Sequence, residues 1–179
     1  KVNVAIIGTK FMGKAHSNAW SQAPKFFDLG LQPVLKVACG HDPKGTQDFA
    51  KNWGWEKVET DWKKVVDDPE VDIVDICTPT YLHKEIVVAA AKNKKQIFSE
   101  KPIALNFAEA KEMYEAAEKA GVLHYLNHNY RRTPAIAFAK KLIDEGKLGQ
   151  IFHWRGTYLQ DWITDPNFPL TWHLQKKFA

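Results

Sequence analysis

The sequence predicts an α/β fold in which helices cover both faces of a doubly wound parallel sheet. Short runs rich in β-branched residues alternate with longer helical patterns as far as about residue 128. The first run leads into a glycine turn and then a helix, the order in which dinucleotide-binding βαβ units begin. From residue 151 the alternation gives way to a different pattern, which indicates the start of a second domain.

Each element of the first domain follows from its local pattern. Apolar runs predict core strands at residues 2–7, 34–39, 71–77, 96–99 and 122–126. Amphipathic patterns predict helices at residues 11–27, 45–53, 82–92, 109–119 and 134–145. Asp61 and Asn106 are suited to N-cap positions, so a further short helix is expected after Asp61. Gly121 ends one helix, and the last one has Pro134 at its start and Gly146 at its end.

The pattern divides the chain into a dinucleotide-binding domain at residues 1–128 and an incomplete second domain at residues 129–179. The second part is expected to hold a connecting helix and one strand. That strand is the segment IFHWRGTYLQDW, in which Phe152, Trp154, Tyr158 and Trp162 share one face. Such a face requires a broad sheet and a packing partner, and no later segment predicts a second strand. We therefore expect the sequence to stop inside this domain.

Composition excludes several classes of protein. With 25 Lys+Arg against 21 Asp+Glu in 179 residues, the net charge of +4 gives no case for a nucleic-acid binder. The longest apolar stretch, residues 86–91, is too short to span a membrane, and the first residues lack the features of a signal peptide. Cys39 and Cys77 form neither a disulfide framework nor a metal-ligand cluster, and we expect both to be buried small hydrophobes. A reducing, cytoplasmic setting and no metal are the resulting expectations.

The strand-to-helix turn VAIIGTKFMG carries the dinucleotide fingerprint of a Rossmann fold with one change. Gly8 and Gly13 occupy its outer glycine positions, and Lys10 replaces the middle glycine. The amides at the start of the helix, with its dipole, would receive a pyrophosphate. The candidate cofactor-binding residues are Gly8, Thr9, Lys10, Phe11, Met12 and Gly13. The alternative is a βα turn whose glycines serve packing alone.

The end of the second strand leaves the cofactor as NAD or NADP. Gly40 stands where a carboxylate that binds the ribose is usual, and His41 and Asp42 follow it. His41 or Lys44 could face a 2′-phosphate, whereas Asp42 could bond the ribose hydroxyls of NAD. His41 is therefore a further candidate cofactor-binding residue.

Four segments together resemble one family. They are GTKFMGKAHSNAW, DICTPTYLHKE, FSEKPIALN and NYRRTP, at residues 8–20, 75–85, 98–106 and 129–134. In this combination they are similar to the GFO/IDH/MocA family of nicotinamide-dependent sugar and polyol dehydrogenases. The last stretch of the chain resembles the branch that contains anhydrosugar and inositol dehydrogenases. The resemblance covers essentially the whole chain.

The triplet Glu100-Lys101-Pro102 is the candidate catalytic segment. It directly follows a core strand, at the carboxyl edge where open α/β sheets bind ligands. An ammonium group there can hold a substrate hydroxyl or stabilise a developing alkoxide. Pro102 would fix the direction of Lys101. The resemblance implies that Lys101 is catalytic and contacts both substrate and cofactor, and that Glu100 belongs to the cofactor site.

The resemblance assigns further residues to the same pocket. It implies that Thr78 and Pro79 line the ribose on the nicotinamide side and that His83 belongs to the cofactor site. It places Arg131 near nicotinamide and substrate. Trp162 is expected to line the pocket and Trp154 to pack in the sheet; the alternative is that Trp154, Tyr158 and Trp162 all serve sheet packing. His16 is expected to pack or cap.

The resemblance implies an NAD- or NADP-dependent oxidoreductase that transfers a hydride between nicotinamide and a secondary alcohol or ketone of a sugar, anhydrosugar or cyclic polyol. Family members carry the general-base histidine in a motif that would follow residue 179, so the fragment alone is expected to be inactive. They also have a large open antiparallel sheet in an α+β substrate domain and associate into homo-oligomers through it. The alternatives are a dinucleotide-binding sensor without turnover and a purely structural α/β domain. The exact substrate and the oligomeric state are not determined by the sequence.

Overall fold

A computed structural model of the chain describes residues 1–178. They form two compact units, the first built on Lys1–Asn127 and the second on His128–Lys177. The first unit contains a complete sheet with its covering helices, and the second contains mostly irregular structure. Each unit has its own architecture.

The first unit is a six-stranded parallel sheet in the order β3-β2-β1-β4-β5-β6. Its strands are β1 (Val2–Ile7), β2 (Pro33–Cys39), β3 (Lys57–Glu59), β4 (Ile73–Ile76), β5 (Gln96–Glu100) and β6 (His124–Asn127). The chain winds outward from β1 in one direction through β3, then returns to the centre and winds outward through β6. This order confirms the predicted doubly wound Rossmann fold.

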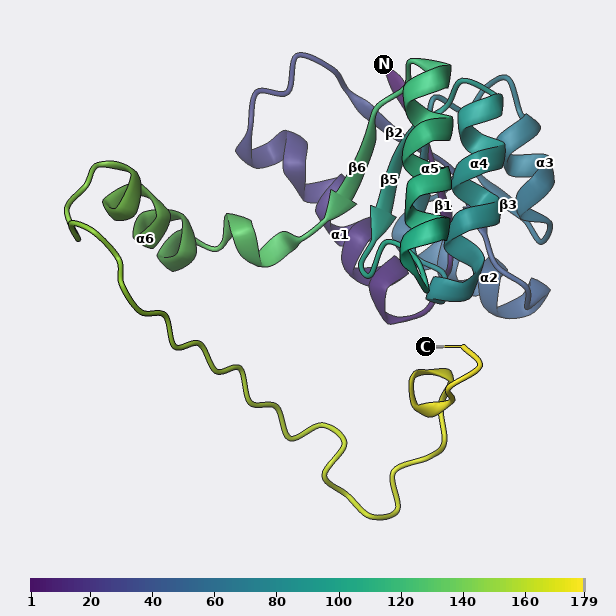
Figure 1. The fold of residues 1–179 in the computed structure, drawn as a ribbon. Helices are drawn as coiled ribbons and strands as arrows, with labels where there is room; N and C mark the ends of the chain where they lie inside the picture. Colours follow the sequence, from purple (N-terminus) through teal and green to yellow (C-terminus); the bar gives the residue numbers. More distant parts are fainter. Residues whose placement is uncertain (179) are drawn as a thin grey trace. The chain divides into compact units, whose positions relative to one another are not determined.

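Helices cover both faces of this sheet (Figure 1). They are α1 (Phe11–Phe26), α2 (Pro43–Trp53), α3 (Trp62–Asp67), α4 (His83–Lys92) and α5 (Phe107–Ala120), with a 3₁₀ turn at Thr80–Leu82. Alternate strand residues point to opposite faces, so the sheet has two cores. Ala5 and Ile7 pack with apolar residues of α3, α4 and α5. Val4 and Ile6 pack in the core that contains Phe49 of α2.

The carboxyl ends of all strands meet at one edge of the sheet, the lower edge in Figure 1. Ile7 pairs with Cys39 on one side and with Ile76 on the other. Because the connections from β1 and β4 leave in opposite directions, the switch point of the sheet lies between their carboxyl ends. Open α/β sheets bind ligands in a crevice at this point. The loops after β1, β4 and β5 therefore surround the place where the sequence predicts a site.

Local signals predicted most elements of this unit. Asp61 accepts a hydrogen bond from the Lys63 amide, and Asn106 accepts one from the Glu109 amide, as expected of N-caps. Gly121 ends α5 in the left-handed conformation, which glycine adopts without strain. The short strand β3 was not predicted. It has three residues and only partial burial at the edge of the sheet, so it lacks the apolar run that reveals the other strands.

The second unit begins with a 3₁₀ turn at Asn129–Arg132 and α6 (Pro134–Asp144), and a 3₁₀ turn at Trp172–Leu174 lies near its end. The predicted helix starts at Pro134 as expected. The strand predicted from residue 151 does not form: residues 151–161 belong to no helix or strand. A strand is stabilised by hydrogen bonds to a neighbour, and the described part of the chain provides none for this segment. Trp154 and Tyr158 are accordingly exposed.

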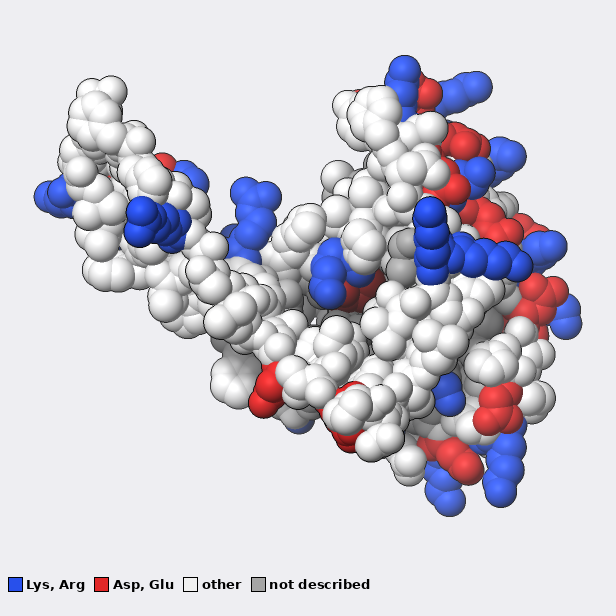
Figure 2. All heavy atoms as spheres, turned by 60° about the horizontal axis from the view of Figure 1, so that its bottom comes forward, with Lys and Arg blue, Asp and Glu red and all other residues white. Residues whose placement is uncertain are grey.

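The surface carries charges of both signs. Over the helices of the first unit, Figure 2 shows Lys and Arg side chains interspersed with Asp and Glu. Among the helices of residues 1–178, none has both the length and the apolar character needed to cross a bilayer.

Candidate functional site

The turn between β1 and α1 requires glycine at both outer positions of the fingerprint. Gly8 has a φ of +111°, and a Cβ added there would lie 2.5 Å from the Cys77 carbonyl oxygen. A Cβ on Gly13 would lie 2.0 Å from the carbonyl oxygen of Gly8. These approaches bring the start of α1 against the ends of β1 and β4, so both glycines have a packing function whether or not a ligand is bound.

The middle position of the fingerprint tolerates lysine because its backbone is ordinary. Lys10 is the N-cap of α1, with φ −85° and ψ −151°, an extended conformation that any residue can adopt. Its exposed side chain makes no capping hydrogen bond, and the first turn of the 16-residue helix contains no acidic residue. The backbone amides and the positive dipole end at the start of α1 are therefore available to an anionic ligand, because no side-chain carboxylate in the first turn competes for them. This donor set fits a pyrophosphate.

The end of β2 has no room for a carboxylate at position 40. A Cβ on Gly40 would lie 2.5 Å from Oγ1 of Thr46 and 2.8 Å from Oγ1 of Thr9. Gly40 thus allows the first helical turn of α2 to pack against the glycine turn. The exposed side chains that follow are His41, Asp42 and Lys44, so the side chains predicted to meet a ribose or 2′-phosphate lie outside the strand itself.

The turn after β4 carries an unpaired polar atom. Oγ1 of Thr78 is buried and has no hydrogen-bond partner within residues 1–178. Pro79 follows in an extended conformation and precedes the 3₁₀ turn. Unpaired buried hydroxyls are uncommon in proteins. Since Thr78 lies beside the crevice, next to the backbone that Gly8 approaches, this hydroxyl fits a ligand-binding role.

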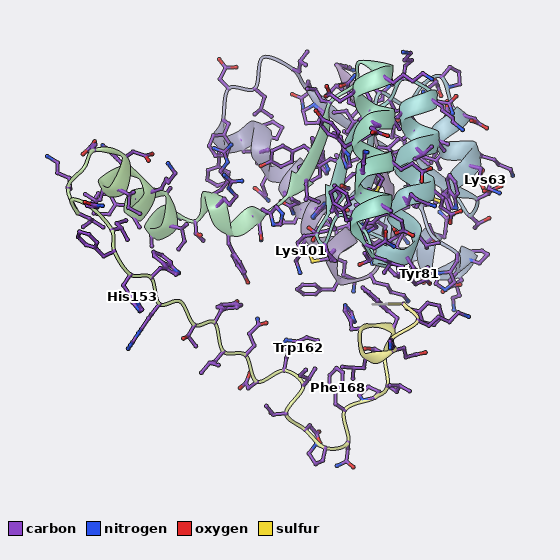
Figure 3. All side chains as sticks on the ribbon, viewed as in Figure 1. Lys63, Tyr81, Lys101, His153, Trp162 and Phe168 are labelled. Carbon is purple, nitrogen blue, oxygen red and sulfur yellow. The ribbon has the colours of Figure 1, made fainter. Side chains whose placement is uncertain are left out.

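Lys101 follows the last residue of β5 at the same edge and is exposed (Figure 3). The Lys101–Pro102 peptide bond is cis. Glu100, by contrast, is 5% exposed and turns its carboxylate inward. Its Oε1 accepts a hydrogen bond from the Asn127 side chain at 2.6 Å, and its Oε2 accepts one from the Lys101 amide at 3.2 Å. That Glu100 belongs to the cofactor site stays a prediction; in this structure its carboxylate supports the segment from inside.

A buried polar cluster lies beneath this edge. The ring of His16, on α1, has Nδ1 at 2.9 Å from Oδ1 of Asp75 and Nε2 at 3.0 Å from Oε1 of Glu100. Nε1 of Trp20 donates to Oδ2 of Asp75 at 2.7 Å. Sγ of Cys77 lies 3.2 Å from His16 Nδ1. The cluster connects α1 with β4 and β5, the elements that carry the glycine turn, Thr78 and Lys101.

A protonated histidine offsets part of the negative charge of the two carboxylates in this cluster. Burial disfavours the charged ring, but hydrogen bonds and attraction from Asp75 and Glu100 outweigh it and raise the pKa of His16 to about 9. Burial also opposes the charge of Glu100, yet the hydrogen bonds from His16 and Asn127 leave its pKa below the usual value. Burial and the two nearby carboxylates raise the pKa of the Cys77 thiol, which therefore stays protonated.

The donor atoms of His16, Asp75 and Cys77 lie within 4.8 Å of one another, a grouping that the sequence did not predict. Each of them already makes contacts inside the cluster. Cys39, the other cysteine, is buried as predicted, and burial raises its pKa to about 12.

His83, the first residue of α4, is fully buried. Its ring nitrogens lie within hydrogen-bond distance of three backbone carbonyls, those of Thr78, Pro102 and Ile103. The ring is thereby engaged with the protein on both sides. That His83 belongs to the cofactor site stays a prediction; in this structure its side chain is enclosed by protein.

Comparison with known proteins identifies the fold unit. Residues 2–128 match the model of a family described as an oxidoreductase family with an NAD-binding Rossmann fold. The chain belongs to the GFO/IDH/MocA family. The match covers all of the strands and the glycine turn, so the first unit is the NAD-binding Rossmann domain of that family.

Several members of the GFO/IDH/MocA family are similar to this chain. It is 48% identical to levoglucosan dehydrogenase of Pseudarthrobacter phenanthrenivorans over 99% of its length and 46% of the relative's. It is 39% identical to scyllo-inositol 2-dehydrogenase (NAD(+)) of Bacillus subtilis over 69% of its length and 37% of the relative's. A solved levoglucosan dehydrogenase, in complex with NADH and levoglucosan, superposes with a TM-score of 0.96 at 47% identity, over 99% of this chain and 48% of that one. The chain thus spans less than half of these relatives.

Within the Rossmann domain, the structure brings the predicted residues Gly8, Gly13, Thr78 and Lys101 to one edge of the sheet. Arg131 and Trp162 belong to the second unit, and their contact with substrate stays a prediction. The cluster around His16 was missed. One signal for it was present: Asp75 is a carboxylate inside an apolar strand, and such a residue requires a buried partner.

Proposed function

We propose that the full-length protein is an NAD-dependent dehydrogenase that oxidises a secondary alcohol of a sugar, anhydrosugar or cyclic polyol. The observation that carries this proposal is the position of Lys101. It is an exposed lysine on a rigidly supported segment at the carboxyl edge of an NAD-binding Rossmann domain. The similarity to levoglucosan and scyllo-inositol dehydrogenases supports the substrate class.

In this proposal Lys101 orients the alcohol. Its ammonium donates a hydrogen bond to the substrate hydroxyl and stabilises the negative charge that develops on oxygen as the proton leaves. When bound, NAD supplies the hydride acceptor at C4 of its nicotinamide ring. The amides at the start of α1 would hold the pyrophosphate, and the Thr78 turn would line the adjoining ribose.

The remaining assignments concern parts of the protein beyond the Rossmann domain. We propose that a histidine following residue 179 removes the hydroxyl proton and that Arg131 and Trp162 line the substrate pocket. We further propose that the second unit belongs to a domain with a large open antiparallel sheet, through which the full-length protein forms homo-oligomers. In such a domain residues 151–162 would gain the strand neighbour that their alternating aromatic pattern requires.

The test is a turnover assay on the full-length protein. Levoglucosan, scyllo-inositol and myo-inositol are offered separately with NAD and with NADP, and formation of reduced nicotinamide is followed by its absorbance. We expect turnover with at least one of these polyols and a higher kcat/KM with NAD than with NADP. Calorimetric binding of NAD without turnover on any of the three would contradict the proposal and favour a dinucleotide-binding sensor.

A further inference from the structure

The buried ring of His83 connects two loops of the carboxyl edge. Its Nδ1 lies 3.0 Å from the Pro102 carbonyl oxygen and 3.3 Å from that of Ile103. Its Nε2 lies 3.0 Å from the Thr78 carbonyl oxygen. Thr78 belongs to the loop after β4, whereas the other two residues belong to the loop after β5. The imidazole is therefore a bridge between the loop beside the crevice and the loop that carries Lys101.

The hydrogen-bonding requirement of this bridge is specific for histidine. Carbonyl oxygens only accept hydrogen bonds, so a ring nitrogen of His83 bonds a carbonyl only where it carries a proton, and a neutral ring donates from one of its two nitrogens. No other side chain of similar size places ring nitrogens on opposite sides of a rigid ring, beside both loops. The ring is also 0% exposed, so water does not compete for these carbonyls from its position. A phenyl ring would fill the space and remove the nitrogen atoms that contact the two loops.

The contact between His83 and the Pro102 carbonyl is separated from Lys101 by a short, stiff stretch of backbone. The carbonyl bonded by His83 belongs to Pro102, the residue directly after Lys101. The pyrrolidine ring locks φ of Pro102, and the peptide bond before it is planar. Only ψ of Pro102 stays soft between the Pro102 carbonyl oxygen and Cα of Lys101. On the other side, the Lys101 amide donates to Glu100, whose carboxylate is bonded to the buried ring of His16.

We propose that His83 is a positioning residue for Lys101. It fixes the backbone on the carboxyl side of the lysine relative to the Thr78 turn, so that the exposed ammonium is presented at one place beside the crevice. This inference rests on the proposed function of Lys101. The sequence led us to expect His83 in the cofactor site. The proposed role is instead exerted through the loop after β5.

The role predicts a specific pattern of kinetics in the full-length protein. His83→Phe is expected to lower kcat by about 10- to 100-fold because a small displacement of a catalytic group costs that much. KM for NAD should change by less than about threefold, since the glycine turn is untouched. His83→Gln keeps one amide donor and should lose less activity than His83→Phe. His124→Phe is the matched control: the ring of this half-buried histidine contacts the Ser99 hydroxyl rather than the Thr78 or Pro102 carbonyl, so kcat should be retained.

A double-variant cycle separates positioning from general destabilisation. If His83 acts through Lys101, His83→Phe has no further effect once Lys101→Met has removed the ammonium, and kcat of the double variant stays within about twofold of Lys101→Met. An equal fold-loss in both backgrounds, or no loss in either, would overturn the proposal. If His83→Phe does not fold, the cycle is completed with His83→Gln.

A second measurement does not depend on turnover. Lysines of the full-length protein are dimethylated with ¹³C, and the Lys101 resonance is assigned by its loss in Lys101→Met. We expect this resonance to shift or broaden in His83→Phe and to be unchanged in His124→Phe. An unchanged resonance in His83→Phe would overturn the positioning role. If the wild-type protein oxidises none of the polyols, the proposed function fails, and this spectrum still decides the role of His83.

Discussion

Nε2 of His16 lies 3.0 Å from Oε1 of Glu100, the residue that directly precedes Lys101. This contact joins the helix that begins at the glycine turn to the strand that presents the exposed lysine. The same ring contacts Asp75 of β4 through its other nitrogen. Three elements that surround the crevice are thus tied to one buried cation, and the stability of the domain depends on that cation.

Stability should fall as the pH rises above neutrality. Folding raises the pKa of His16 from an ordinary 6.5 to about 9. A group with a raised pKa contributes its full stabilisation below about pH 6.5 and loses it progressively up to about pH 9. We expect a loss on the order of 3 kcal/mol between these limits, from the size of the shift. Urea denaturation at pH 6.5, 7.5 and 9 measures it, and His16→Phe should flatten this part of the profile.

Glu100 should make the stability of the domain fall at low pH as well. Its pKa is lowered in the folded protein, so its contribution is present above its ordinary pKa and is lost as the pH falls through the lowered value. Glu100→Gln should therefore make the free energy of unfolding less sensitive to acid. A denaturation profile below pH 5 that is the same for wild type and Glu100→Gln would contradict this.

Replacing His16 should be far more damaging than removing an exposed cation. His16→Phe leaves Asp75 and Glu100 buried without a positive partner, which costs about 3–5 kcal/mol. Lys111→Ala is the matched control, because it breaks an exposed ion pair with Glu115 on α5 and should have little effect. Thermal and urea unfolding compare the two. A similar, small loss for both would show that the buried cluster is not a main support of the fold.

The glycine turn gives a steric prediction. Gly13→Ala would place Cβ 2.0 Å from the Gly8 carbonyl oxygen and force α1 away from β1. We expect a loss of about 1–3 kcal/mol in stability and weaker NAD binding by calorimetry. Gly30→Ala is the control: its position has a positive φ but open space, so it should cost about 1 kcal/mol without affecting NAD. Equal NAD affinity in both variants would argue against pyrophosphate binding at α1.

The preference for NAD should depend on Asp42. With Gly40 barred from carrying a side chain, Asp42 is the exposed carboxylate that follows β2 and would repel a 2′-phosphate. Asp42→Ala should lower the ratio of NAD to NADP affinity by about fivefold, the effect of about 1 kcal/mol of repulsion in water. Binding of both cofactors is measured by calorimetry. A ratio that does not change would place the discrimination on other residues.

The sequence predicted the Rossmann fold well because its signals are local. Apolar runs mark the buried strands, and Asp61, Asn106 and Gly121 mark helix ends through bonds within a few residues. The position of Lys101 at the crevice also followed, because every parallel strand ends at the same edge. The features that the sequence did not predict depend on contacts between distant segments of the chain. The cluster of His16, Asp75 and Glu100 joins residues 59 and 84 positions apart, and no short pattern reports such pairs.

The same reason explains why the backbone contacts of His83 and the conformation of residues 151–161 were not predicted. The carbonyl partners of His83 come from loops that lie side by side only once β4 and β5 are paired. The alternating pattern from residue 151 predicts a strand, but a strand also needs a neighbour, and the described residues supply none.

The most direct test of the account is the effect of Lys101→Met on the full-length protein with NAD and its best polyol substrate. We expect kcat to fall by about 10²- to 10⁴-fold while calorimetric NAD affinity changes by less than about threefold, because the lysine acts on the alcohol and the glycine turn is intact. Lys92→Met, at an exposed position in the last turn of α4, should retain full activity. A Lys101→Met enzyme with wild-type kcat would contradict the account.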